Sequence, residues 1–149
     1  MLVLAAALSF AIALLHLVII FLGPEAYTYF GAAELGALEA QGSRMPDLLT
    51  LVLVAVFTVF GLYALSGASV IRRLPLLRTG LIAIGSIYTL RGLVVIPDLI
   101  RLVQGAGYPI RQAVFSAVSL AIGLAYLFGT ARHWPFIRRP AVDRHAAAT

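Results

Sequence analysis

Six side chains that could hold a ligand are predicted to gather near one end of a set of apolar helices. His16 and Arg91 each lie six residues before the expected end of an apolar stretch, so both lie roughly 9 Å inside that end at about 1.5 Å per residue. Glu25 and Glu34 follow the first stretch, and Tyr88 lies one helical turn from Arg91. The predicted ligand-binding residues are His16, Glu25, Glu34, Tyr88, Arg91 and Gln112.

Such a cluster is suited to binding an anion or a carbonyl oxygen, or to moving a proton. An arginine in apolar surroundings can hold an oxyanion or a quinone carbonyl, and a histidine beside a glutamate can transfer a proton. Arg91 and His16 also have a structural explanation, since Arg91 can extend its stem toward an interface and an isolated histidine can simply be hydrogen-bonded. The sequence has no Ser–His–Asp order and no phosphate-binding loop, so no catalytic residue is assigned.

Metal and cofactor chemistry is not expected from this composition. The chain has no cysteine, which excludes thiolate zinc sites and iron–sulfur clusters. Ligation by two histidines would need a partner for His16 at the same depth, but His133 and His145 follow the last apolar stretch at the opposite side. We therefore predict no metal and no cofactor.

The elements that must position these side chains are four apolar stretches. The chain has 149 residues, of which 62% are hydrophobic and 11% charged, whereas a soluble domain carries about 25% charged residues. Each stretch is near the ~20 residues that cross a bilayer. The predicted fold class is all-α, an integral membrane four-helix bundle forming one domain over residues 1–134. Its helices are predicted at about 2–22, 48–67, 75–97 and 109–130.

The arginines indicate the orientation of this bundle. All eleven basic residues are arginines, and they are concentrated in the 68–79 connection and the C-terminal tail. The positive-inside rule then places both termini in the cytoplasm, the N-in/C-in arrangement of a multi-pass inner (plasma) membrane protein. Trp134 is a predicted interfacial anchor, and residues 135–149 are predicted to be a disordered cytoplasmic tail. Because the arginines flank apolar stretches, the expected partner is the lipid bilayer and not nucleic acid.

Small and weakly polar residues recur every three or four positions along the predicted fourth helix, as in Gln112, Ser116, Ser119, Gly123, Tyr126 and Thr130. Stripes of this kind are more typical of helix-packing seams than of a substrate path. They leave open an alternative function, a structural or assembly subunit of a membrane complex or a homo-oligomer.

The preferred function is an accessory protein whose outward-facing pocket binds a small lipophilic or anionic ligand. A third alternative is a small membrane redox or quinone-linked enzyme component, so whether the protein is an enzyme stays open. Asp98 is assigned to a connection over residues 98–111, so no acidic residue is expected in the middle of a span. A proton-coupled exporter would be expected to carry one at its binding site.

The first expected helix is followed by the outer turn GPEAYTYFGA and then by a second helix that contains GLYALSG, where Gly61 and Gly67 precede the pair Arg72 and Arg73. This layout resembles the DoxX-like family of small four-helix membrane proteins. The resemblance covers about residues 10–95. Phe57 stands where that family often has an acidic residue, so the resemblance implies the four-helix fold more than a redox role. Functions in such a family are diverse, and the fold does not supply one.

Overall fold

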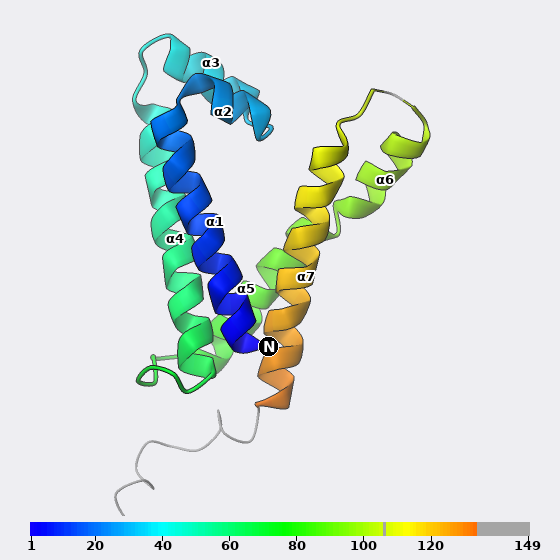
Figure 1. Cartoon of the computed structure of the whole chain (residues 1–149). Helices are drawn as coiled ribbons and strands as arrows, with labels where there is room; N and C mark the ends of the chain where they lie inside the picture. The colour runs from blue at the N-terminus through cyan, green and yellow to red at the C-terminus, as the bar shows by residue number, and fades with distance from the viewer. Residues whose placement is uncertain (106, 134–149) are drawn as a thin grey trace, which may run out of the picture.

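The computed structural model describes residues 1–105 and 107–133, and every regular element within them is a helix (Figure 1). Four segments are long and apolar enough to cross a membrane: Leu2–Leu22, Met45–Gly67, Leu77–Val103 and Ile110–Arg132. They correspond to α1 (Leu2–Leu22), α4 (Met45–Gly67), α5 (Leu77–Gly92) with α6 (Val95–Val103), and α7 (Ile110–Arg132). The prediction of an all-helical fold with four apolar helices is confirmed to that extent.

Two short helices, α2 (Pro24–Tyr29) and α3 (Ala33–Ala40), connect α1 to α4. They fill a segment that carries three of the six acidic residues, Glu25, Glu34 and Glu39. Pro24 occupies the first position of α2, where a proline costs no intrahelical hydrogen bond. The predicted anchor Trp134 and the predicted tail 135–149 lie outside the described residues.

The third span differs from its predicted boundaries. It was predicted to end or kink at Pro97, but the helix breaks at residues 93–94 and resumes as α6 through Val103. The break falls there because Pro97 has no N–H to donate and its ring crowds the carbonyl of Leu93, four residues earlier. Asp98, predicted in a connection, therefore lies inside a helix and inside the third apolar span.

The helices form two pairs that meet at one end of the molecule and diverge toward the other. α1 packs along α4, and α5 packs along α7 (Figure 1). At the end where the N-terminus lies, the pairs are in contact: Leu2 lies against Gly129, and Leu81 against Gly67. The opposite end, which carries α2, α3 and α6, is called the cap end below.

The crossing of α5 and α7 depends on glycines that bring the two backbones close together. A Cβ atom placed on Gly92 would lie 2.3 Å from the backbone nitrogen of Leu120, and one on Gly123 would lie 2.4 Å from Oγ1 of Thr89. The predicted stripe on α7 is thus largely an intramolecular seam. Ser116, Gly123, Tyr126 and Thr130 are buried by the chain's own helices.

Hydroxyl groups from three helices hydrogen-bond to one another in the core where the pairs meet. Tyr88 donates to Ser9 Oγ at 3.3 Å, and Ser9 Oγ lies 2.9 Å from the hydroxyl of Tyr126. Tyr126 donates in turn to the carbonyl of Phe60 at 2.8 Å. The rings of Tyr88 and Tyr126 are stacked with centroids 5.8 Å apart. This chain of bonds satisfies the buried hydroxyls and fixes the two pairs relative to each other.

Candidate ligand-binding site

Arg91 lies on an exposed face of α5, one turn before the helix breaks. Its Nη1 donates to Ser116 Oγ on α7 at 3.3 Å, and this is the hydrogen bond it makes among the described residues. A guanidinium carries five N–H donors in a planar fork. Most of the hydrogen-bonding capacity of Arg91 is therefore available to a ligand.

Asp98, in α6, carries a buried carboxylate. The sequence analysis placed this residue in a connection and not in a span. Its side chain is 2% exposed. Oδ2 accepts a hydrogen bond from Ser116 Oγ at 2.6 Å, and Oδ1 accepts one from the hydroxyl of Tyr108 at 2.5 Å. The bond to Asp98 raises the pKa of the Tyr108 phenol, and burial raises it further. Tyr108 therefore stays a donor, and both carboxylate oxygens are occupied.

A second arginine completes this group of side chains. The guanidinium carbon of Arg101, an exposed residue of α6, lies 5.7 Å from the centroid of the Tyr108 ring. We call Arg91, Asp98, Arg101, Tyr108 and Ser116 the α5–α7 polar cluster. It contains two permanent positive charges and one carboxylate, so it can attract an anion but offers no unoccupied carboxylate as a base.

His16 is held mainly by its own helix and by an aromatic neighbour. Its Nδ1 lies 2.8 Å from the carbonyl of Ile12, so Nδ1 is the donor and Nε2 is the acceptor in the neutral ring. The ring is half-buried and packs on Phe57 with centroids 5.0 Å apart. Phe57 also lies 6.0 Å from the ring of Tyr88. His16 and Tyr88 thus share one aromatic contact, whereas Arg91 belongs to the polar cluster.

The remaining predicted residues lie at the cap end: Glu25 and Glu34 on α2 and α3, which together we call the cap, and Gln112 on α7. Glu25 and Glu34 are exposed, and neither makes a hydrogen bond or ion pair with another described residue. Gln112, at the start of α7, places its amide nitrogen 2.5 Å from where a Cβ of Gly31 would be, and the positive φ of Gly31 (+93°) favours glycine there. Of the six predicted residues, the described contacts connect His16 with Tyr88 but connect neither of them with Arg91.

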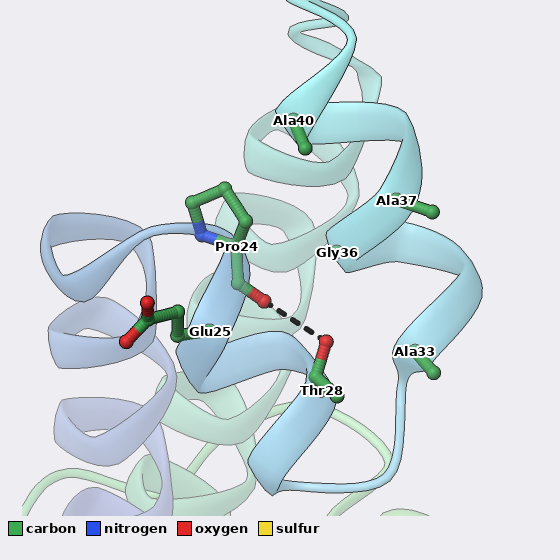
Figure 2. A pocket seen from close by; sticks show the side chains of 7 residues that line it. All are labelled: Pro24, Glu25, Thr28, Ala33, Gly36, Ala37 and Ala40. Atoms are coloured by element: carbon green, nitrogen blue, oxygen red, sulfur yellow. Dashed lines mark hydrogen bonds between the residues drawn. The ribbon is translucent and has the colours of Figure 1, made fainter.

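A groove of about 380 Å³ lies between α2 and α3 (Figure 2). It is lined by Pro24, Glu25, Thr28, Ala33, Gly36, Ala37 and Ala40. Thr28 uses its hydroxyl within α2, donating to the carbonyl of Pro24 at 3.2 Å. The carboxylate of Glu25 points away from α3 in Figure 2. The groove is apolar and open, and no set of polar groups converges in it to orient a ligand.

A separate set of polar side chains fastens the cap to α4. Tyr27, in α2, is only 3% exposed and donates to Thr50 Oγ1 at 3.0 Å. Burial raises the pKa of Tyr27. Burial also raises the pKa of Glu39, with a further contribution from the nearby negative charge of Asp47. The Tyr27–Thr50 hydrogen bond anchors α2 to α4 and involves none of the polar cluster.

The turn after α2 also reaches the second helix pair. The rings of Phe30 and Phe115 lie 5.6 Å apart, and the guanidinium carbon of Arg111 lies 4.9 Å from the centroid of the Tyr29 ring. We call these four residues the cap contact. It joins α2 to the first turns of α7 across the divergent ends of the two pairs (Figure 1).

Sequence reasoning missed Asp98, Ser116, Tyr108 and Arg101 as site residues because it ended the third helix at Pro97. A usable signal was present. Val95, Ile96, Leu99, Ile100 and Val103 continue the helical spacing of apolar residues beyond the proline. A proline in the first turn of a helix is tolerated, so a second helix starting just before Pro97 fits this pattern.

Comparison of the chain with protein-family models, with curated proteins and with solved structures finds no match. The function is therefore argued from the chemistry of the α5–α7 polar cluster and its surroundings.

Proposed function

We propose that the chain is a multi-pass inner (plasma) membrane protein that binds a small lipophilic ligand with an anionic head in an accessory role. Both termini lie in the cytoplasm and the cap end faces outward. This orientation is supported by Arg72 and Arg73, which lie between α4 and α5, and by Arg78 in the first turn of α5, all at the end opposite the cap end. The acidic residues of α2 and α3 lie on the outer side.

The observation that carries the ligand proposal is Arg91, a cation inside an apolar span. It lies 14 residues beyond Leu77, a rise of about 21 Å, whereas the hydrocarbon core is about 30 Å thick. Arg91 is therefore roughly 9 Å short of the outer boundary. Its neighbours Ile87, Leu90 and Val94 are exposed apolar side chains. An arginine in such surroundings costs up to ~2.5–3.5 kcal/mol, and pairing with an anion reduces that cost.

The polar cluster holds Arg91 in position for such an anion. Ser116 donates to Asp98 and accepts from Arg91, so the direction of its hydroxyl is set by the carboxylate. A guanidinium fixed in this way loses less conformational entropy when it binds a ligand. Arg91 is thus a preorganised cation that opens toward lipid.

The subunit alternative is weakened by where the small residues lie. The seam of α7 faces α5, with Gly92 against Leu120 and Gly123 against Thr89, so it is occupied by the chain itself. A relationship to the DoxX-like family remains a prediction, supported by the four apolar helices alone.

The proposal is tested by thermal unfolding of the full chain in a neutral maltoside detergent. The probes are four amphiphiles with the same twelve-carbon chain: laurate, dodecyl phosphate, dodecanol and dodecyltrimethylammonium. We expect Tm to rise with an anionic probe only, and the rise to be lost in Arg91→Gln. Arg44→Gln is the matched control, because Arg44 is an exposed arginine at the start of α4 on the cap side. An equal response in wild type and Arg91→Gln would contradict the proposal.

A further inference from the structure

We infer that the head of this ligand is a single carboxylate on one long alkyl chain, that is, a long-chain carboxylic acid. This inference rests on the proposed function and specifies the ligand of the same site. It draws on the charge of the polar cluster, on the depth of Arg91 and on the apolar side chains beside it.

The charge of the cluster matches an anion with one negative charge. Arg91 and Arg101 are positive, and Asp98 is negative because both of its oxygens accept hydrogen bonds from hydroxyl groups. One positive charge is left over. A monoanion makes the site neutral, whereas a dianion such as a phosphate monoester leaves an excess negative charge in a medium of low dielectric constant.

The depth of Arg91 favours a head with few polar atoms. A ligand that reaches Arg91 has to bring its head roughly 9 Å below the outer boundary, as the helical rise from Leu77 shows. A phosphodiester brings its glycerol or other polar substituent along, and those groups lose their hydration. A carboxylate brings two oxygens, and the guanidinium fork can bind both in parallel.

The alkyl chain has an apolar surface to follow from Arg91 toward the middle of the membrane. Ile87 lies one turn from Arg91 on the same face of α5, and its side chain is 53% exposed. Ala83, one turn further, is also exposed. The opposite face of α5 is closed by α7 at Gly92 and Leu120. The alkyl chain of the ligand therefore lies along the exposed face that Arg91, Ile87 and Ala83 share.

The test compares head groups at constant chain length in the full-length protein. Tm is measured against the concentration of laurate and of dodecyl phosphate at about pH 8, where the phosphate monoester is doubly charged. We expect laurate to reach half of its maximal effect at a concentration about tenfold lower than dodecyl phosphate. Butyrate, which has the same head on a short chain, should have no effect over the same range.

Two variants assign the effect to Arg91. Arg91→Gln should abolish the response to laurate, and Arg91→Lys should weaken it about tenfold because an ammonium group cannot bind a carboxylate through two parallel bonds. Arg91→Lys keeps the charge, so it supplies the comparison if Arg91→Gln does not fold.

The results distinguish failure of this inference from failure of the proposed function. If dodecyl phosphate acts at lower concentration than laurate and the effect depends on Arg91, the carboxylate inference is overturned and the proposed function stands. If butyrate acts as well as laurate, the long chain is excluded and both are overturned. A response to laurate that is as strong in Arg91→Gln and Arg91→Lys as in wild type also overturns both.

Discussion

The hydroxyl of Ser116 lies 2.6 Å from the carboxylate of Asp98, and this bond fastens α6 to α7 across a break in the third span. The other side of the short helix α6 carries exposed apolar residues such as Leu99 and Val103, which do not bind it to α7. Loss of the Ser116–Asp98 bond would therefore weaken the attachment of α6 to α7. The same hydroxyl accepts from Arg91. One serine therefore fixes both the position of α6 and the direction of the proposed ligand-binding cation.

Replacing Ser116 with alanine is expected to lower Tm by roughly 5 °C, because Asp98 would keep its burial and lose a hydrogen-bond donor. The laurate response should also weaken, since Arg91 would lose the group that positions it. Ser119→Ala is the control: Ser119 is on the same helix, but its hydroxyl bonds to the carbonyl of Phe115 within α7. Equal Tm values for the two variants would exclude a special role for Ser116. Thermal unfolding in detergent measures both effects.

Replacing Gly92 with alanine is expected to destabilise the fold by about 1–3 kcal/mol, since the new methyl group would meet the backbone of Leu120 at 2.3 Å. Gly92 is the last residue of α5, so alanine gains less there than the ~1 kcal/mol that it brings to a helix interior, and the clash outweighs that gain. Gly61→Ala should cost less, because its Cβ would meet the side chain of Phe10, which can move. Unfolding in denaturant at equilibrium gives both values. If Gly61→Ala loses more stability than Gly92→Ala, the close approach of the α5 and α7 backbones does not make Gly92 the more sensitive position, and the prediction is wrong.

The cap contact should appear as coupling between Phe30 and Phe115. Their rings are 5.6 Å apart, and aromatic pairs of this kind contribute about 0.5–1.5 kcal/mol beyond their buried area. We expect the double variant Phe30→Ala, Phe115→Ala to lose less stability than the two single variants together. Pairing Phe30→Ala with Phe128→Ala, an exposed ring on α7, provides the control and should give additive losses. Coupling no larger than in this control would mean that the cap does not hold the second helix pair.

The raised pKa of Glu39 predicts a stability that falls as pH increases. Because burial and Asp47 favour the protonated form in the folded chain, the folded state binds more protons than the unfolded state between the two pKa values. The stabilisation from protonated Glu39 is complete below the ordinary pKa of 4.5 and is lost as pH rises through the raised value. Glu39→Gln should therefore raise Tm at neutral pH by about 2 °C and have little effect in acid.

The control for this pH dependence is Glu34→Gln, an exposed glutamate on the same helix. Its Tm difference from wild type should not change between neutral and acidic pH. If Glu39→Gln lowers Tm at neutral pH, the carboxylate of Glu39 stabilises the cap as an anion and the sign of the argument is wrong.

The four apolar helices could be predicted from sequence because each is a run of apolar residues of a length that only a spanning helix requires. The residues at their ends were harder to place. Pro97 was interpreted as an end or a kink of the third helix, although a proline removes one hydrogen bond and can equally stand in the first turn of a new helix. That one interpretation moved Asp98 into a connection and hid the carboxylate of the polar cluster.

The predicted site shows what spacing along a sequence can and cannot provide. Depth was predicted for His16 and Arg91 from their distance to the ends of their helices, but direction was not. His16 faces Phe57 on α4, whereas Arg91 faces Ser116 on α7. The directions of these two side chains depend on which helices form pairs. The pairing in turn depends on close contacts between residues far apart in the chain, such as that between Gly92 and Leu120.

The divergence of the two helix pairs gives the molecule a tapered shape, narrow at the end with the N-terminus and wide at the cap end (Figure 1). In the proposed orientation, such a wedge displaces more lipid from the outer leaflet than from the inner one. Its free energy then depends on the lateral pressure that each leaflet exerts. We expect the protein to accumulate where the outer leaflet is expanded, as on the convex side of a curved membrane, independently of any ligand that it binds.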